Sequence, residues 1–178
     1  MVVTFCGHSS VHPREPVEAW LRESVAALIA RGADKFYLGG YGAFDLMAAS
    51  VVWELKKGRP DIASVLVLPY LDRKVCADNY DYTTYPPLET VPKRFAISKR
   101  NEWMIQNSDV AVAYVTHDWG GAAATLKFAE RKGKGIIRYP PRSNKRSSRF
   151  SGVGRSRVRG VSSDSNGASS SSIRYALS

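Results

Sequence analysis

The chain has 178 residues, 44% of them hydrophobic, which suits a single globular domain with a core of its own. Its net charge of +10 is unevenly divided: residues 1–137 hold 17 Lys and Arg against 15 Asp and Glu, whereas residues 138–178 hold nine against one. The basicity therefore belongs to the end of the chain, and it does not argue for nucleic-acid binding by the rest.

We expect neither a membrane-spanning segment nor a secretion signal in this sequence. No apolar run is long enough to cross a bilayer, and the first residues lack the basic and apolar regions of a signal peptide. The two cysteines, Cys6 and Cys76, do not suggest a disulfide framework. We therefore expect a cytoplasmic protein with no membrane partner.

Short apolar strands alternate with amphipathic helices in the first part of the chain. The sequence predicts strands at residues 2–6, 36–38 and 64–68, because each is a short apolar run bounded by turn residues. Between these strands, apolar residues recur at helical spacing: Val17, Trp20, Leu21, Val25, Leu28 and Ile29 in the first helix, then Phe44, Met47, Ala48, Val51 and Leu55 in the second.

The middle of the chain is less regular. Residues 70–92 have little periodicity, and so long an interruption predicts a functional lid or a disordered insert. Residues 97–130 then indicate a helix, a buried strand at 109–115, a glycine turn, and a second helix that opens near Leu126. Residues 135–139 form the last predicted strand. The alternation predicts an α/β fold with a parallel sheet covered by helices on both faces.

After the last strand the composition changes. Residues 140–178 are rich in Ser, Arg and Gly, with few large apolar residues to offset the entropy cost of ordering. We predict a globular domain at residues 1–139 and a disordered tail at 140–178. Translation in a shifted frame would produce the same break.

Three glycine-containing turns follow three of the predicted strands. They are Gly7-His8-Ser9-Ser10, Gly39-Gly40-Tyr41-Gly42 and Gly120-Gly121. Turns that follow parallel strands all lie at the carboxyl edge of the sheet, where α/β proteins bind ligands near the switch point of strand order. Each turn alone is ordinary, but together they predict one binding site with free backbone N–H groups, which attract phosphate.

The common nucleotide and metal motifs are absent. No third glycine follows Gly42 at dinucleotide spacing, and no phosphate loop of the Gly-x4-Gly-Lys-Ser/Thr type occurs, which disfavours ordinary NAD-dependent redox chemistry and ATP hydrolysis. Cys6, His8 and His12 do not make a set of ligands at zinc-like spacing. We expect no metal and no cofactor.

Several side chains near the turns have two interpretations each. Asp45 could complement the dipole of a helix start, or it could bind a ribose or act as a base. Arg100 could lie on a solvated helix face, or its planar fork could bind phosphate. Thr125 could donate its hydroxyl to that phosphate, or it could cap or pack. Ser9 and Ser10 favour a phosphate-donor or capping role over a nucleophile, because no Gly-x-Ser-x-Gly elbow surrounds them.

Five short motifs between residues 2 and 137 resemble one superfamily in their order and spacing. They are Phe5-Cys6-Gly7-His8-Ser9, Gly39-Gly40-x-Gly42-x-Phe44-Asp45-x-x-Ala48-Ala49, Lys99-Arg100-Asn101-x-x-Met104, Asn107-Ser108-Asp109, and Gly120-Gly121 with Thr125 and Ala129. They resemble the SLOG superfamily, which joins the DNA-processing Smf/DprA proteins to the "Lonely Guy" phosphoribohydrolases. The branch that they resemble most is the bacterial YpsA-like domain of unknown function.

The resemblance implies a Rossmann-like fold that binds a nucleotide or a nucleotide-derived ligand at the glycine turns. "Lonely Guy" enzymes cleave the base–ribose bond of a nucleoside monophosphate, using an Arg-Lys pair and a turn that carries a catalytic glutamate. Here Arg100 matches the arginine, but Asn101 replaces the lysine and Lys127 stands where the glutamate would be. Binding is therefore expected, whereas that type of hydrolysis is in doubt.

We therefore expect binding of a nucleotide-type small molecule, in a sensor or processing protein that could also form a homo-oligomer. The expected ligand-binding residues are Gly7, His8, Ser9, Ser10, Gly39, Gly40, Gly42, Asp45, Arg100, Asn101, Gly120, Gly121 and Thr125. One alternative is an N-glycosidic-bond-cleaving or ribosyl-transferring enzyme, for which Asp45 and Arg100 are weak catalytic candidates. Another is a single-stranded DNA-binding module, which the near-neutral charge of residues 1–137 disfavours.

Overall fold

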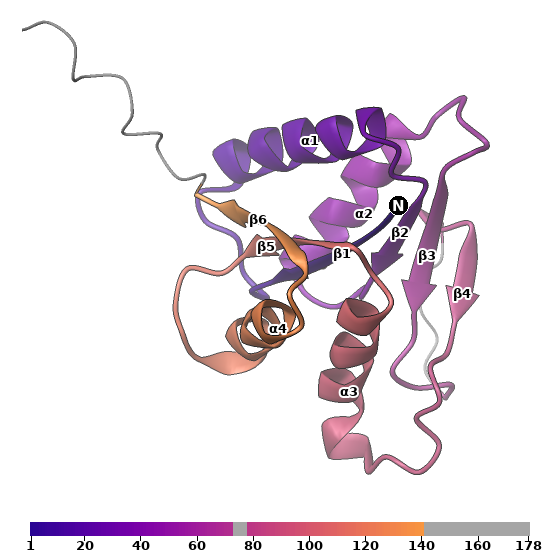
Figure 1. Ribbon diagram of the computed structural model, residues 1–178, viewed down its shortest axis with the longest axis vertical. Coiled ribbons are helices and arrows are strands. Elements are labelled where there is room, and N and C mark those ends of the chain that lie inside the picture. The colour runs from indigo at the N-terminus through magenta and orange to yellow at the C-terminus, as the bar shows by residue number, and fades with distance from the viewer. Residues whose placement is uncertain (73–77, 141–178) are drawn as a thin grey trace, which may run out of the picture. The chain divides into compact units, whose positions relative to one another are not determined.

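The structure is a computed structural model, and it describes residues 1–72 and 78–140. Helices and strands alternate along these residues (Figure 1): β1 (Val2–Gly7), α1 (Arg14–Ala30), β2 (Lys35–Leu38), α2 (Ala43–Leu55), β3 (Ala63–Val67), β4 (Tyr82–Thr84), α3 (Lys93–Gln106), β5 (Val110–Tyr114), α4 (Gly120–Arg131) and β6 (Gly135–Tyr139). The predicted disordered tail lies outside the described residues from position 141 onward, and the domain boundary at 139 stays a prediction.

All neighbouring strands of the sheet run parallel, in the order β4-β3-β2-β1-β5-β6. Val3 of β1 lies beside Phe36 of β2 on one side and Val110 of β5 on the other. The chain builds outward from β1 to β4 and then returns to the other side of β1, so the strand order switches between β1 and β5. The predicted α/β fold with a parallel sheet is confirmed.

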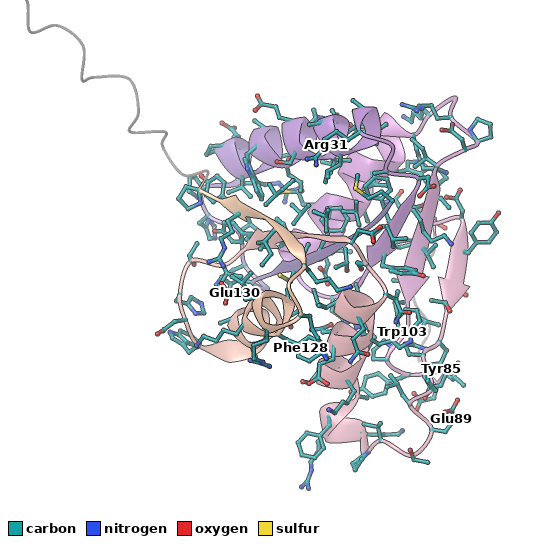
Figure 2. All side chains as sticks on the ribbon, viewed as in Figure 1. Arg31, Tyr85, Glu89, Trp103, Phe128 and Glu130 are labelled. Atoms are coloured by element: carbon teal, nitrogen blue, oxygen red, sulfur yellow. The ribbon has the colours of Figure 1, made fainter. Side chains whose placement is uncertain are left out.

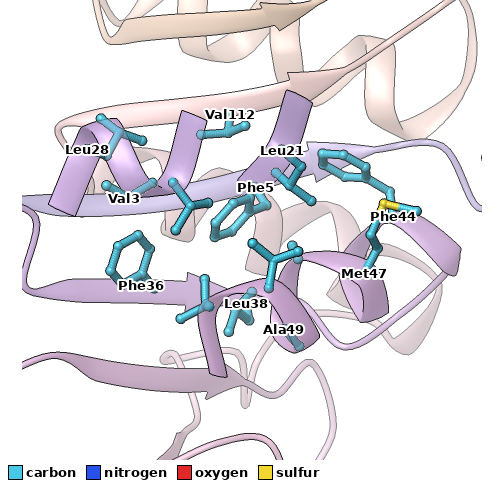
Figure 3. Close-up of a cluster of buried hydrophobic side chains, with 14 of the residues drawn as sticks. Val3, Phe5, Leu21, Leu28, Phe36, Leu38, Phe44, Met47, Ala49 and Val112 are labelled. Atoms are coloured by element: carbon cyan, nitrogen blue, oxygen red, sulfur yellow. The ribbon is translucent and has the colours of Figure 1, made fainter. Parts of the chain in front are cut away.

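Helices cover both faces of the sheet: α1 and α2 lie on one face, and α3 and α4 on the other (Figure 1). Side chains of β1 alternate between these faces, as the two-residue period of a strand requires. Phe5 points into a cluster with Leu21, Phe36 and Phe44 (Figure 3), whereas Cys6 packs with Ala113 and Leu126 on the opposite face. On that opposite face Trp103 of α3 lies against Tyr37 of β2 (Figure 2).

The structure corrects the sequence analysis at residues 70–92, which include the short edge strand β4. The Asp81 carboxylate holds this strand in place, since it accepts hydrogen bonds from the Ser64 backbone N–H (2.7 Å) and hydroxyl (2.9 Å). It also pairs with Lys56 Nζ at 2.5 Å. The prediction of a disordered insert is therefore wrong at residues 82–84, because three residues are too few to show a period of their own. Residues 73–77 of the segment lie outside the described residues, and a lid function stays a prediction.

A second correction concerns the helix after β5. We expected this helix to open near Leu126, but α4 already begins at Gly120. The two glycines therefore form its first turn rather than a separate turn before it. This places their backbone N–H groups at the end of a helix, where the first four are left without intrahelical acceptors.

Candidate functional site

A cavity of about 590 Å³ opens at the carboxyl ends of β1, β2 and β5, where the strand order switches. We call it the switch-point cavity. Twelve of the thirteen expected ligand-binding residues line it: Gly7, His8, Ser9, Ser10, Gly39, Gly42, Asp45, Arg100, Asn101, Gly120, Gly121 and Thr125. The three glycine turns, far apart in sequence, thus share one wall, as parallel-sheet geometry requires.

Gly40 is the expected site residue that does not line this cavity. Its φ of +70° lies in the left-handed region, and a Cβ on it would come within 2.7 Å of Leu66 Cδ1. The glycine is therefore explained by the shape of the turn and by its close approach to β3.

The glycines of the first two turns are surrounded by other parts of the protein. A Cβ on Gly7 would lie 2.2 Å from the Phe44 ring, and a Cβ on Gly42 would lie 2.9 Å from the Ser9 backbone. A Cβ on Gly39 would lie 2.5 Å from Asp45 Oδ2 and 2.8 Å from Arg100 Nη1. Close packing already accounts for these three glycines, whether or not a ligand binds.

The glycines of the third turn face open space. A Cβ on Gly120 or Gly121 would meet no atom within 4 Å, and no side chain caps the N-terminus of α4. Within the described part of the chain, no backbone carbonyl accepts a hydrogen bond from either amide. The start of α4 therefore presents unpaired N–H donors and the positive end of a helix dipole to the cavity.

Arg100 is buried, with 1% of its surface exposed, so the solvated-face interpretation is wrong. Its Nη1 donates hydrogen bonds to the carbonyls of Gly39 (2.5 Å) and Val67 (2.9 Å), which ties α3 to the ends of β2 and β3. Its Nε is buried and has no hydrogen-bond partner among the described residues, although the residue lines the cavity. A buried guanidinium N–H without an acceptor is costly, and an anion in the cavity would supply one.

Asp45 lies in the first turn of α2, and its Oδ2 accepts a hydrogen bond from the Tyr41 backbone N–H at 3.2 Å. Burial raises the pKa of this carboxyl to about 6, while the Arg100 charge and the Tyr41 hydrogen bond oppose the rise. The residue is therefore both a helix-start acceptor and a carboxyl group that titrates near neutral pH inside a cavity. The second property is typical of groups that transfer protons.

The remaining predicted side chains differ in whether their hydroxyl groups already form hydrogen bonds within the protein. Thr125 donates its hydroxyl to the Gly121 carbonyl (2.8 Å) and accepts from Asn101 Nδ2 (3.3 Å), so this hydroxyl is already engaged within the protein. Ser9 and Ser10 are exposed on the cavity wall, and the Ser9 carbonyl accepts the first amide of α2, from Ala43 (2.9 Å).

The loop after β1 is held by Tyr114 at the end of β5. The Tyr114 hydroxyl donates to the His12 carbonyl (3.0 Å) and accepts from the His12 backbone N–H (3.2 Å). The His8 backbone N–H also donates to the Tyr114 carbonyl, at 3.2 Å. The loop that carries the two serines is therefore anchored directly to the neighbouring strand.

Sequence reasoning missed three aromatic residues of the loops that line the cavity: Tyr41, His117 and Trp119. The Tyr41 ring lies 5.5 Å from Arg100 Cζ, while His117 and Trp119 stack on each other in the loop before α4. The available signal was their position, since all three sit in or beside a glycine turn whose convergence was predicted.

Residues 1–72 and 78–140 contain neither a cluster of metal-ligating side chains nor a membrane-spanning helix. No three His, Cys, Asp or Glu side chains of this part converge as metal ligands, and no helix of it is long and apolar enough to cross a membrane. Cys6 lines the cavity as a buried thiol, and burial, with a smaller effect from the Asp45 charge, raises its pKa to about 12. A thiol with so high a pKa is a poor nucleophile.

The chain matches no protein-family model and no curated protein. Among solved structures it is similar to DNA processing protein A from Helicobacter pylori, studied for its single-stranded DNA binding mode, with a TM-score of 0.55 and 18% identity over 81% of this chain and 67% of that one. It is also similar to the Moco carrier protein of Chlamydomonas rheinhardtii, with a TM-score of 0.50 and 17% identity over 77% and 74%. These similarities show a shared fold.

Proposed function

We propose that this protein binds a nucleotide or a nucleotide-derived ligand in the switch-point cavity, with an anionic group at the start of α4. The observation that carries the proposal is the convergence of three strand-end turns on one cavity that contains unpaired N–H donors. The unpartnered Nε of Arg100 supports an anionic ligand independently of the helix start. Both structural neighbours are ligand-binding proteins, so binding is a function that this fold carries out elsewhere.

The expected roles follow from the geometry. The Gly120 and Gly121 amides donate to the anionic group, and the exposed hydroxyls of Ser9 and Ser10 are free to donate as well. Arg100 contributes through its Nε, because its Nη1 is engaged by two carbonyls. Asp45 is left to accept hydrogen bonds from a sugar hydroxyl. We also propose that the protein belongs to the YpsA-like branch and that it acts in the cytoplasm.

Thermal-shift and calorimetric measurements with nucleotides, sugar phosphates and ADP-ribose derivatives test this proposal. The decisive variant is Gly121→Glu, because a carboxylate at a helix start suits the dipole and the fold yet repels an anion. Ala124→Glu is the matched control, since Ala124 is exposed on the same helix and does not line the cavity. We expect ligand binding in the wild type and in Ala124→Glu, and none in Gly121→Glu. The proposal is wrong if none of these ligands stabilises the wild-type protein.

A second candidate function is hydrolysis or transfer at a nucleotide N-glycosidic bond. The observation that favours it is the Asp45 carboxyl, whose raised pKa of about 6 suits a general acid or base. Release of free base from a nucleoside monophosphate, measured by chromatography, would establish it. Loss of that release in Asp45→Asn, with binding retained, would assign the carboxyl to the chemistry. If the wild type binds the nucleotide without releasing base, hydrolysis is excluded, and transfer is excluded as well if no base is released when a ribosyl acceptor is added.

A further inference from the structure

Three aromatic rings form a continuous stack at the mouth of the switch-point cavity. The centroids of His8 and His117 are 3.7 Å apart with planes at 20°, and those of His117 and Trp119 are 3.8 Å apart with planes at 19°. His8 comes from the turn after β1, whereas the other two come from the loop after β5. The stack therefore joins two of the three turns that line the cavity.

Hydrogen bonds fix the orientation of both imidazole rings. His8 Nε2 accepts from the Thr116 backbone N–H at 3.0 Å, so Nδ1 carries the proton of the neutral ring. His117 Nδ1 lies 3.1 Å from the Trp119 carbonyl, which can only accept, so this nitrogen is the donor. Neither ring is free to rotate out of the stack without losing a hydrogen bond. The stack is therefore a preformed element of the cavity wall.

The outer end of the stack is open. Trp119 is 69% exposed although His117 covers one of its faces, so the opposite face of the indole is accessible to solvent. Within the part of the chain that the structure describes, His117 is the one ring packed against it. A large aromatic side chain left exposed beside a cavity marks a binding surface, because its burial by a partner is favourable.

Trp119 also directly precedes the unpaired amides of Gly120 and Gly121. A flat aromatic face and a cluster of anion-binding donors are thus neighbours in one wall of the cavity. A ligand that satisfies both would carry a planar ring and an anionic group, separated by a short linker. Nucleoside monophosphates have this arrangement, with ribose as the linker.

We propose that the exposed face of Trp119, backed by His117 and His8, binds the heteroaromatic ring of the ligand by stacking. This inference rests on the proposed function, and it adds that the ring contributes to affinity in addition to the phosphate. Any planar base presents a π face, so such a platform selects for aromatic ligands without strong preference among bases. One base–aromatic stack typically contributes about tenfold or more to affinity.

The test compares two probes that differ in the base alone, adenosine 5′-monophosphate and ribose 5-phosphate. Calorimetric titration of the full chain is carried out on the wild type, Trp119→Ala and Trp119→Phe. We expect the wild type to bind the nucleotide about tenfold or more tightly than the sugar phosphate. In Trp119→Ala this ratio falls to near one with sugar-phosphate affinity unchanged, and in Trp119→Phe most of the ratio returns. Trp119 is exposed, so these variants should keep the melting temperature of the wild type.

The outcomes separate this inference from the function on which it rests. If both probes bind the wild type equally, or if Trp119→Ala weakens both to the same extent, the stacking role is overturned while anion binding stands. If neither probe binds, the stacking role is overturned as stated, whereas the proposed function is overturned only when the other nucleotides and the ADP-ribose derivatives also fail to bind. If Trp119→Ala leaves the nucleotide preference intact, the base is held elsewhere and the inference is wrong.

Discussion

The starts of α2 and α4 are two versions of the same motif, a glycine turn between a strand and a helix, with opposite outcomes. At α2 the protein satisfies its own donors: the Ser9 carbonyl accepts the Ala43 amide, and Asp45 accepts the Tyr41 amide. At α4 no backbone carbonyl among the described residues accepts the Gly120 or Gly121 amide, and a Cβ on either glycine would meet no described atom within 4 Å. Gly42 and Gly120 share a positive φ, of +90° and +85°, which favours glycine at the start of either helix. The comparison teaches that two further causes then differ between the turns, close packing within the protein at α2 and open space at α4.

Among the changes near the closely packed start of α2, removal of the Arg100 side chain should reduce the stability of the protein most. Arg100→Met leaves the Gly39 and Val67 carbonyls without a donor and Asp45 without its counter-charge, so we expect a loss of about 3–5 kcal/mol in unfolding free energy. Lys99→Met is the control, because Lys99 is an exposed neighbour paired with Glu102, and its loss should cost less than about 1 kcal/mol. Equal effects in urea denaturation would contradict the buried role of Arg100.

Alanine at Gly7 and at Gly121 separates the two causes of glycine directly. Gly7→Ala drives a methyl group into the Phe44 ring, and such overpacking should cost about 1–3 kcal/mol or more. Gly121→Ala meets open space and has no positive φ, so the fold should be unchanged or gain up to about 1 kcal/mol of helix propensity. Thermal unfolding measures both. Similar destabilisation by the two variants would refute the distinction.

The carboxyl at the packed turn should make stability depend on pH. The folded-state pKa of Asp45 is raised from 3.8 to about 6, so the folded protein holds a proton that the unfolded chain releases between these values. Relative to Asp45→Asn, the wild type should therefore lose stability as pH rises from about 4 to about 6. The loss is at most about 3 kcal/mol, and partial exposure of the residue reduces it. If the stability of the wild type relative to Asp45→Asn instead increased with pH, the attraction between Asp45 and Arg100 would outweigh the effect of burial on the pKa.

The smallest expected effect on stability comes from His8, in the ring stack beside the open start of α4. Burial and the neighbouring His117 lower the pKa of His8 below 6.5, so the folded protein holds fewer protons than the unfolded chain. Its contribution to stability is therefore present above pH 6.5 and is lost as pH falls through the folded pKa. His8→Phe keeps an aromatic ring without titrating and serves as the control. NMR titration of the His8 ring should give a midpoint below 6.5, and a midpoint above that value would contradict the lowered pKa.

Sequence patterns predicted the regular part of the fold well because burial on both faces leaves apolar runs. The prediction at residues 109–115 became β5 (Val110–Tyr114), and that at 135–139 became β6 (Gly135–Tyr139). β4 was missed, because an edge strand of three residues is fixed by the Asp81 contacts rather than by its own sequence. Tertiary contact, not local propensity, decides such an element.

The location of the candidate site could be predicted from the sequence, but the contacts between its side chains could not. Parallel topology alone brings Gly7, Gly39 and Gly121 to one cavity. The burial of Arg100 could not be read from a charged residue on a helix, since that pattern is common on solvated faces. The stack of His8, His117 and Trp119 depends on loop conformations after two strands that are far apart in sequence, so no single window of residues contains it.

The clamp of Tyr114 on His12 has a kinetic consequence for whatever enters the cavity. Its hydroxyl is hydrogen-bonded to both the carbonyl and the amide of one residue, so the loop between β1 and α1 is held in place without a ligand, and we expect it to keep this position when one binds. A wall that is complete in advance imposes no ordering cost on association. Stopped-flow mixing should therefore give a single phase whose rate increases linearly with ligand concentration, whereas Tyr114→Phe should introduce a plateau set by loop rearrangement.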